Sequence, residues 1–213
     1  MTDVKFAFDE TTITDRACGD CSACCVHLKI DQTELQKPAD VACEHLAKPS
    51  GCSIYESRPS VCRTWNCAWR IFPWLDDSLR PDRTGILVDL YRGERLGLIL
   101  RSMGKKEAFF NPKILQIIGA CIEGDHPVFI SVPTRPGYCN ARCQLNVGMK
   151  TAATSHELGQ MIEGMKAAYA HAEATITNPE SGFNSHIIAP KSRLTPCPCG
   201  SGKMYKKCHG TLI

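Results

Sequence analysis

The chain has 213 residues, of which 43% are hydrophobic and 22% are charged, a balance typical of folded globular proteins. This length supports one main domain and one small additional unit. The formal net charge of +3 is too small to indicate a nucleic-acid-binding surface over the whole molecule, so we expect no sequence-specific nucleic-acid partner. Residues 1–6 lack a basic segment followed by an apolar run, and no apolar stretch reaches the ~18 residues of a membrane span, so we expect a cytoplasmic protein.

The most unusual feature of the composition is its 14 cysteines. In a reducing compartment, closely spaced cysteines bind metal more often than they form disulfides. A tetrahedral zinc site takes four ligands, and eight clustered cysteines exceed one such site. Either two ions bind, or some of these cysteines pack in the core or support the ligands. The candidate ligands are Cys18, Cys21, Cys24, Cys25, Cys43, Cys52, Cys62 and Cys67, with His27 and His45 nearby.

An iron–sulfur cluster is an alternative for the same cysteines, because it also takes four thiolates from closely spaced pairs and distant partners. Spacing alone does not separate zinc from iron. Aromatic residues that follow the cysteines could shield a cluster from water, although core packing is their more common role. These residues are Trp65, Trp69, Phe72 and Trp74.

The order and spacing of the cysteines resemble a known family. The series CGDCSACC at 18–25, CEHL at 43–46 and CSIYESRPSVCRTWNCAW at 52–69 is similar to the CxxCxxCC (YkgJ-type) cysteine-cluster family. That family is described as a zinc- or iron-chelating domain, so the resemblance implies metal chelation by the motif cysteines and no particular reaction. A related pattern in a flagellin lysine methylase accompanies an iron–sulfur cluster, which keeps that alternative open.

Local signals around the second half of the cluster predict short elements. Residues 54–55 read as extended, and the turn at 57–59 leads into a helix, because proline suits the first helical turn. Cys62 and Cys67 are expected on this helix or just beyond it. The polar residues 76–83 then predict a loop.

The middle of the chain predicts a small α+β unit. Residues 84–91 and 95–101 flank a glycine-containing turn and predict a β-hairpin. Asn111 and Pro112 open a predicted helix that ends at Gly124. Cys121 lies on its apolar face, where a buried small hydrophobe is the expected role. Residues 127–132 predict a further strand, and the unit continues directly from the cysteine-rich part.

Two further cysteines, Cys139 and Cys143, lie in the loop that follows, where they could either add ligands or simply pack. After this loop, Thr154 and Glu157 form a predicted capping box. Apolar residues then recur at helical spacing from Leu158 to Ala172 and predict a helix with one buried face.

The last part of the chain predicts a linker and a separate zinc unit. Residues 178–195 have the composition of a linker, and the unit that follows contains Cys197, Cys199, Cys208 and His209. Three thiolates and one imidazole complete a closed tetrahedral site, which leaves no position for a substrate water. So few apolar residues surround it that the segment should not fold without an ion.

This segment resembles the SEC-C motif over residues 197–210. The resemblance implies a zinc-binding knuckle like the C-terminal one of the SecA translocation motor, a contact site for chaperone, lipid or ribosome. Lys203, Lys206 and Lys207, with no acidic residue after Glu180, suit a negatively charged partner, although a solvated basic face is an equal alternative. Iron can also occupy such a site.

The sequence contains no serine elbow, phosphate loop or HExxH pair, so we identify no catalytic residue and expect a non-enzymatic protein. The predicted fold class is α+β: a small irregular metal-stabilised domain with a short antiparallel sheet and helices, plus a zinc knuckle. The predicted units are a chelating domain at 1–177, a linker at 178–195 and a SEC-C knuckle at 196–213. The predicted function is zinc or iron binding, with the knuckle docking on a ribosome, secretion-machinery or other protein partner. An iron–sulfur protein or enzyme is the alternative.

Overall fold

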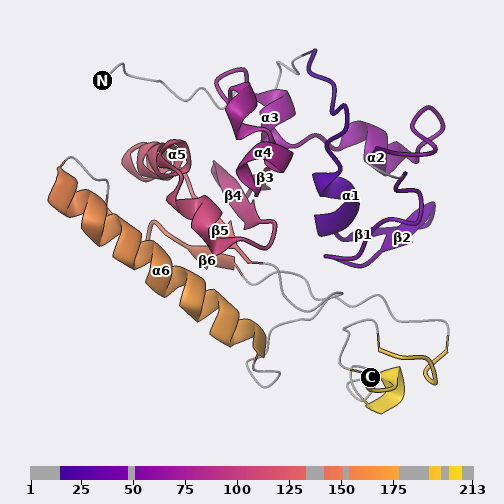
Figure 1. Cartoon of the computed structure of the whole chain (residues 1–213). Coiled ribbons are helices and arrows are strands. Elements are labelled where there is room, and N and C mark those ends of the chain that lie inside the picture. The colour runs from indigo at the N-terminus through magenta and orange to yellow at the C-terminus, as the bar shows by residue number, and fades with distance from the viewer. Residues whose placement is uncertain are drawn as a thin grey trace.

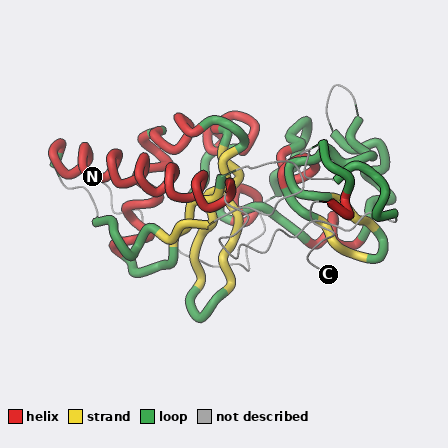
Figure 2. Tube along the Cα trace, turned by 90° about the horizontal axis from the view of Figure 1, so that it is seen from below, coloured by secondary structure: helices red, strands yellow, loops and turns green. Residues whose placement is uncertain are grey.

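The computed structural model describes residues 15–47, 51–132, 142–150, 154–177, 192–197 and 202–207. Its helices and strands confirm the α+β class. The cysteine-rich part is mostly loop with short helices, and a second part places longer helices over a sheet (Figures 1 and 2). Within the described residues, no helix is long and apolar enough to cross a membrane.

The cysteine-rich part contains only short elements. Its first helix and hairpin are α1 (Ala23–His27), β1 (Ile30–Gln32) and β2 (Leu35–Lys37). They are followed by α2 (Ser60–Thr64) and α3 (Ala68–Ile71). The β1–β2 pair is antiparallel and forms a sheet of its own. The sequence predicted a helix after Pro59, which α2 confirms, but it did not predict α1 or the β1–β2 hairpin.

The predicted hairpin of the middle region is confirmed as β3 (Ile86–Arg92) and β4 (Leu96–Ser102), which pair antiparallel. The predicted helix is α5 (Pro112–Glu123), and the Asn111 side chain caps it by accepting from Lys113 N at 3.0 Å. Just before α5 lies the 3-10 helix η2 (Lys106–Phe110). The predicted strand at 127–132 is β5 (Val128–Ser131).

The sheet has the order β3-β4-β5-β6, with β6 formed by Arg142–Gln144. The sequence predicted a short antiparallel sheet, which the β3–β4 and β5–β6 pairs confirm, whereas β4 and β5 pair in parallel because η2 and α5 cross between them. Gly97 in β4 is required by this pairing, since a Cβ there would lie 1.9 Å from the carbonyl oxygen of Pro127. The neighbouring Leu98 N donates to that same oxygen at 2.9 Å.

The polar segment before the sheet differs from the loop that the sequence predicted. It forms the 3-10 helix η1 (Asp77–Leu79) and the short helix α4 (Pro81–Thr84). Asp76 caps η1 by accepting from Ser78 N at 2.8 Å. The charged residues at 76–83 therefore lie on two short helical turns, the first of which is capped by Asp76, and apolar positions such as Leu79 are buried.

The core lies between the sheet and the helices α3, α5 and α6. Helix α6 (Ser155–Thr177) begins with the predicted capping box: Thr154 N donates to Glu157 Oε2 at 2.8 Å and Glu157 N donates to Thr154 Oγ1 at 3.3 Å. Met161 and Met165 of α6 are buried, whereas Leu158 is exposed. Trp69 and Phe72 are buried in the same core, which supports their packing role. A last 3-10 turn, η3, spans Tyr205–Lys207.

Candidate metal centre

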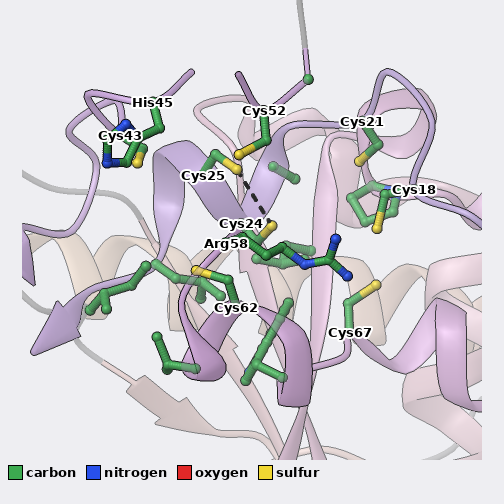
Figure 3. Close-up of a pocket in the computed structure, with 18 of the residues that line it drawn as sticks. Cys18, Cys21, Cys24, Cys25, Cys43, His45, Cys52, Arg58, Cys62 and Cys67 are labelled. Atoms are coloured by element: carbon green, nitrogen blue, oxygen red, sulfur yellow. Dashed lines mark hydrogen bonds between the residues drawn. The ribbon is translucent and has the colours of Figure 1, made fainter. Parts of the chain in front are cut away.

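One cavity of about 350 Å³ is lined by all eight clustered cysteines that the sequence singled out. Figure 3 shows them around this hollow: Cys18, Cys21, Cys24, Cys25, Cys43, Cys52, Cys62 and Cys67. His45 lines the cavity too. His27 instead contacts Asp40, with 2.9 Å between Nδ1 and Oδ1. The structure therefore brings together residues that are almost 50 positions apart in the chain, 18 to 67.

The first four cysteines are held by a turn and a helix. Cys21 N donates to the carbonyl of Cys18 at 3.0 Å, and Gly19 takes a positive φ of 57° in this turn. A side chain is disfavoured at that φ, so glycine suits the position. Cys24 and Cys25 lie on α1, and their sulfur atoms are 4.0 Å apart. The CxxC spacing thus forms a tight turn next to the helix.

The distant cysteines are tied to the first group through the backbone. Cys43 N donates to the carbonyl of Cys25 at 2.9 Å. Cys52 is positioned by an antiparallel bridge to Leu46. Cys62 lies within α2, and Cys67 directly precedes α3, as the sequence predicted. Cys67 is 8% exposed and packs in the main core, so it fixes one edge of the cavity.

The contact between Cys24 and Cys25 makes the two thiols different in acidity. The hydrogen bond from Cys24 lowers the pKa of Cys25 to about 7, and the positive charge of Lys37 acts in the same direction. The same contact, together with burial, raises the pKa of Cys24. Burial raises the pKa of Cys67 to about 11. The contact therefore favours one thiolate within the pair, and the thiolate is the form of cysteine that binds metal.

Lys37 is a buried cation behind the cavity, only 3% exposed. Its ammonium group donates to the carbonyl oxygens of Val26, Pro38 and Val41 at 2.8, 2.9 and 2.7 Å. Burial lowers the pKa of Lys37 to about 8, and the charges of Asp40, Cys43 and Cys25 oppose that shift. The sequence reasoning missed Lys37. A lysine gives no hydrophobic signal in the sequence, so nothing there indicated its burial on β2.

Further cations border the cavity itself. Arg58 donates to the carbonyl of Tyr55 at 2.9 Å, and its guanidinium lies 3.8 Å from the centre of the Tyr55 ring. In Figure 3 the Arg58 side chain extends among the labelled cysteines. The cationic lining residues are Lys29, Arg58, Arg70 and Arg101. Positive charge beside a thiol-rich cavity favours thiolates over thiols.

The donor set of this cavity fits a thiophilic metal, because many sulfurs and one imidazole converge in one partly buried space. In tetrahedral zinc coordination the ligand sulfurs lie about 3.8 Å apart, given Zn–S bonds of about 2.3 Å. The 4.0 Å separation of the Cys24 and Cys25 sulfurs is close to that spacing. Among the residues that the structure describes, no group of three or more Cys, His, Asp or Glu is arranged so that it could hold a metal ion. The described cysteines are free thiols rather than disulfides.

Two other cysteines lie outside the cavity. Cys121 is 1% exposed on α5, which confirms its expected role as a buried small hydrophobe. Cys143 is half-buried on β6, opposite Ile130, and is not among the residues that line the cavity. Cys139 lies outside the described residues. The interpretation of Cys143 as a packing residue is therefore favoured over that of a ligand.

The described residues near the C-terminus pair with one another through their backbones. Pro196 and Met204 make an antiparallel bridge, and Cys197 N donates to the carbonyl of Lys203 at 2.8 Å. Tyr205 N donates to the carbonyl of Thr195 at 2.9 Å. Cys197 and Tyr205 are buried. This pairing fixes the backbone of Cys197, the first candidate ligand of the tail, beside Lys203.

Comparison with known proteins identifies this segment. A profile of the SEC-C motif matches residues 195–211. The chain carries a SEC-C motif. Protein translocase subunit SecA of Acinetobacter baylyi is 35% identical over 83 residues, which is 39% of this chain and 9% of the relative. The SecA proteins of Laribacter hongkongensis and Aromatoleum aromaticum are each 44% identical over 52 residues, which is 21% and 24% of this chain and 6% of each relative.

The chain therefore spans less than a tenth of the length of these curated relatives. No solved structure matches the chain. Of the four candidate ligands in the SEC-C motif, the structure describes Cys197, whereas Cys199, Cys208 and His209 lie outside the described residues. Residues 178–191 of the predicted linker at 178–195 also lie outside the described residues.

Proposed function

We propose that this protein binds metal through thiolates at two places and uses its SEC-C knuckle to dock on a partner. The proposed units are a chelating domain at 1–177, a linker at 178–195 and a zinc knuckle at 196–213. The observation that carries the first part is the convergence of the eight clustered cysteines on one cavity. The resemblance of residues 16–75 to the CxxCxxCC family supports the same function.

The chemistry of the cavity supports metal storage or structural chelation more than a reaction. Thiolates bind Zn²⁺ and iron strongly, and one cavity thiol, Cys25, already has a pKa of about 7. Cavity cations would balance the negative charge of thiolate-bound metal. An iron–sulfur cluster is the second candidate, because the cavity of about 350 Å³ is larger than one or two bare ions need and Trp65 forms part of its wall.

The proposed docking function rests on the SEC-C motif and on the charge of the tail. Lys203, Lys206 and Lys207 are exposed, with Lys206 and Lys207 on η3. Zinc held by Cys197, Cys199, Cys208 and His209 would fix this basic turn in one conformation. The relatives that share the segment are named protein translocase subunits. A negatively charged surface of the secretion machinery or the ribosome is the partner that this chemistry favours.

Metal analysis of the full chain tests the chelating function. The protein is purified anaerobically with reductant, and bound zinc and iron are measured together with the visible absorption spectrum. We expect at least one ion in the cavity and one in the tail. A Cys197→Ser, Cys208→Ser double variant should lose only the tail ion, while the Cys121→Ser control should lose none. Less than one bound ion per reduced chain would refute the proposed metal binding. A brown sample that contains iron and sulfide would favour the iron–sulfur cluster over zinc.

Docking is tested by binding of the full chain, a chain ending at residue 195, and a Lys203, Lys206, Lys207 to glutamine variant. Purified ribosomes and purified translocation components serve as the partners. We expect that only the full chain binds and that its affinity falls steeply as the salt concentration rises. Equal binding by all three chains would contradict docking through the knuckle.

A further inference from the structure

We infer that the cavity also binds a small organic carboxylate, which would lie against the sheet and be held by arginine side chains. This binding would be distinct from metal chelation, because the sheet residues that line the cavity include no cysteine. The main ligand-binding group is the guanidinium of Arg101 on β4, and Arg58 supplies a second guanidinium to the lining.

One wall of the cavity is a face of the sheet. The residues of β3 and β4 that line the cavity are Leu87, Asp89 and Arg101. Leu87 and Arg101 are direct partners in the antiparallel ladder, so their side chains point to the same face of the sheet. Asp89 follows Leu87 by two residues on β3 and therefore shares that face. The cavity thus lies between the sheet and the cysteine-rich part, and boundaries of this kind are common places for ligand sites.

Arg101 places a positive charge in this wall. It is 7% exposed, an unusual degree of burial for an arginine. Its backbone is fixed on both sides, because it pairs with Leu87 of β3 and with Ser131 of β5. A residue on a rigid strand holds its side chain more precisely than a residue on a loop. A planar guanidinium can donate two parallel hydrogen bonds to one carboxylate, so Arg101 is suited to recognise that group.

Arg58 is held in a defined orientation by its neighbour Tyr55. It donates to the carbonyl of Tyr55 at 2.9 Å, and its guanidinium lies 3.8 Å from the centre of the Tyr55 ring. That hydrogen bond uses one of the five N–H groups of a guanidinium. In Figure 3 the Arg58 side chain extends among the labelled residues that surround the hollow. Arg58 can therefore donate to a ligand without giving up its contact with Tyr55.

The charged residues of the lining favour an anion. Among the described residues that line the cavity, four are basic and one, Asp89, carries a carboxylate. The basic residues are Lys29, Arg58, Arg70 and Arg101. Lys29 has its own partner in Asp31, at 2.8 Å. Asp89 can offset only one of the two charges of Arg58 and Arg101, so a ligand with a single negative charge would complete the balance.

The volume and the apolar lining favour an organic ligand over an inorganic anion. The cavity volume of about 350 Å³ lies within the range of small-molecule sites, which begins at about 300 Å³. The apolar residues of the lining include Leu28, Leu35, Val61, Trp65 and Leu87. Burial of an apolar ligand body against them would stabilise the complex, whereas a phosphate dianion would be costly to desolvate there. The favoured ligand is therefore a monocarboxylate with an apolar body.

Titration of the reduced, isotope-labelled full chain with benzoate, followed by NMR, tests carboxylate binding. Bound metal is measured on the same sample, so the result does not depend on whether the chain chelates metal. We expect saturable shifts of the backbone amides of Leu87, Asp89 and Arg101, with a Kd of about 1 mM. Benzamide has nearly the same shape without the charge, and it should bind roughly tenfold more weakly because the charge-assisted hydrogen bonds are lost. Equal affinity for benzamide, shifts that do not saturate, or shifts confined to the tail would overturn the inference.

Two variants connect the binding to the arginines. Arg101→Gln and Arg58→Gln should each weaken benzoate binding by about tenfold and leave benzamide binding within about twofold. Arg95→Gln is the matched control, because Arg95 directly precedes β4 but is exposed and pairs with Asp125 outside the cavity lining. If Arg101→Gln disturbs the amide spectrum of the whole sheet, Arg58→Gln decides, since Arg58 lies outside the sheet. Unchanged benzoate affinity in a folded variant of either arginine would overturn the inference.

Discussion

Removal of metal should unfold the cysteine-rich part and leave the sheet folded. Within the described residues 15–47 and 51–64, only three apolar side chains are buried, those of Ala23, Leu35 and Ala39. Burial of one leucine contributes about 1.5–3 kcal/mol and an alanine methyl about 0.8 kcal/mol, so apolar burial here amounts to about 3–5 kcal/mol. Structural zinc contributes about 10–16 kcal/mol per site. If the proposed metal is bound, it would therefore contribute more to the stability of this part than apolar burial does.

Hydrogen exchange measured by mass spectrometry checks this prediction. The reduced protein is compared before and after a zinc chelator, with metal content measured on the same sample. Peptides from 15–64 should lose most of their protection, whereas peptides from β4, α5 and β5 should keep theirs, because those elements belong to the main core. Unchanged protection across 15–64 in a metal-free sample would refute the reasoning, since a coreless region would then be stable alone.

Three substitutions probe the rest of the fold. Ile130→Ala, in the fully buried centre of β5, should cost about 2–5 kcal/mol in urea unfolding, and a loss below 1 kcal/mol would contradict the core assignment. Cys121→Ala should lower stability by about 1 kcal/mol with no loss of metal. Asp76 accepts hydrogen bonds from Lys113 and Ser78, which lower its pKa to about 2. The contribution of the Asp76 carboxylate to folding stability is present above a pH of about 4 and is lost as the pH falls toward 2. Asp76→Asn should therefore reduce the loss of unfolding free energy between pH 4 and pH 2 by at most about 1 kcal/mol, because the Asp76–Lys113 pair is exposed.

The sequence predicted the regular elements of the middle region because their signals are local. The turn between β3 and β4, the Asn111–Pro112 start of α5 and the Thr154–Glu157 capping box each depend on a few neighbouring residues. The parallel pairing of β4 with β5 depends instead on a crossover, and β6 has only three residues. Neither feature produces a hydrophobic periodicity that can be detected in a short window of sequence.

For the candidate site, too, the sequence predicted the features that depend on local signals and missed those that depend on tertiary contacts. Cysteine chemistry and spacing predicted which residues converge, and the cavity lined by all eight agrees with that expectation. The directions in which the thiols of Cys24 and Cys25 point depend on α1, a five-residue helix with no capping side chain, whose position is set by tertiary contacts. The same is true of Lys37, a polar residue whose burial follows only from the pairing of β2 with β1. The directions of these two thiols and the burial of Lys37 were therefore beyond the reach of sequence alone.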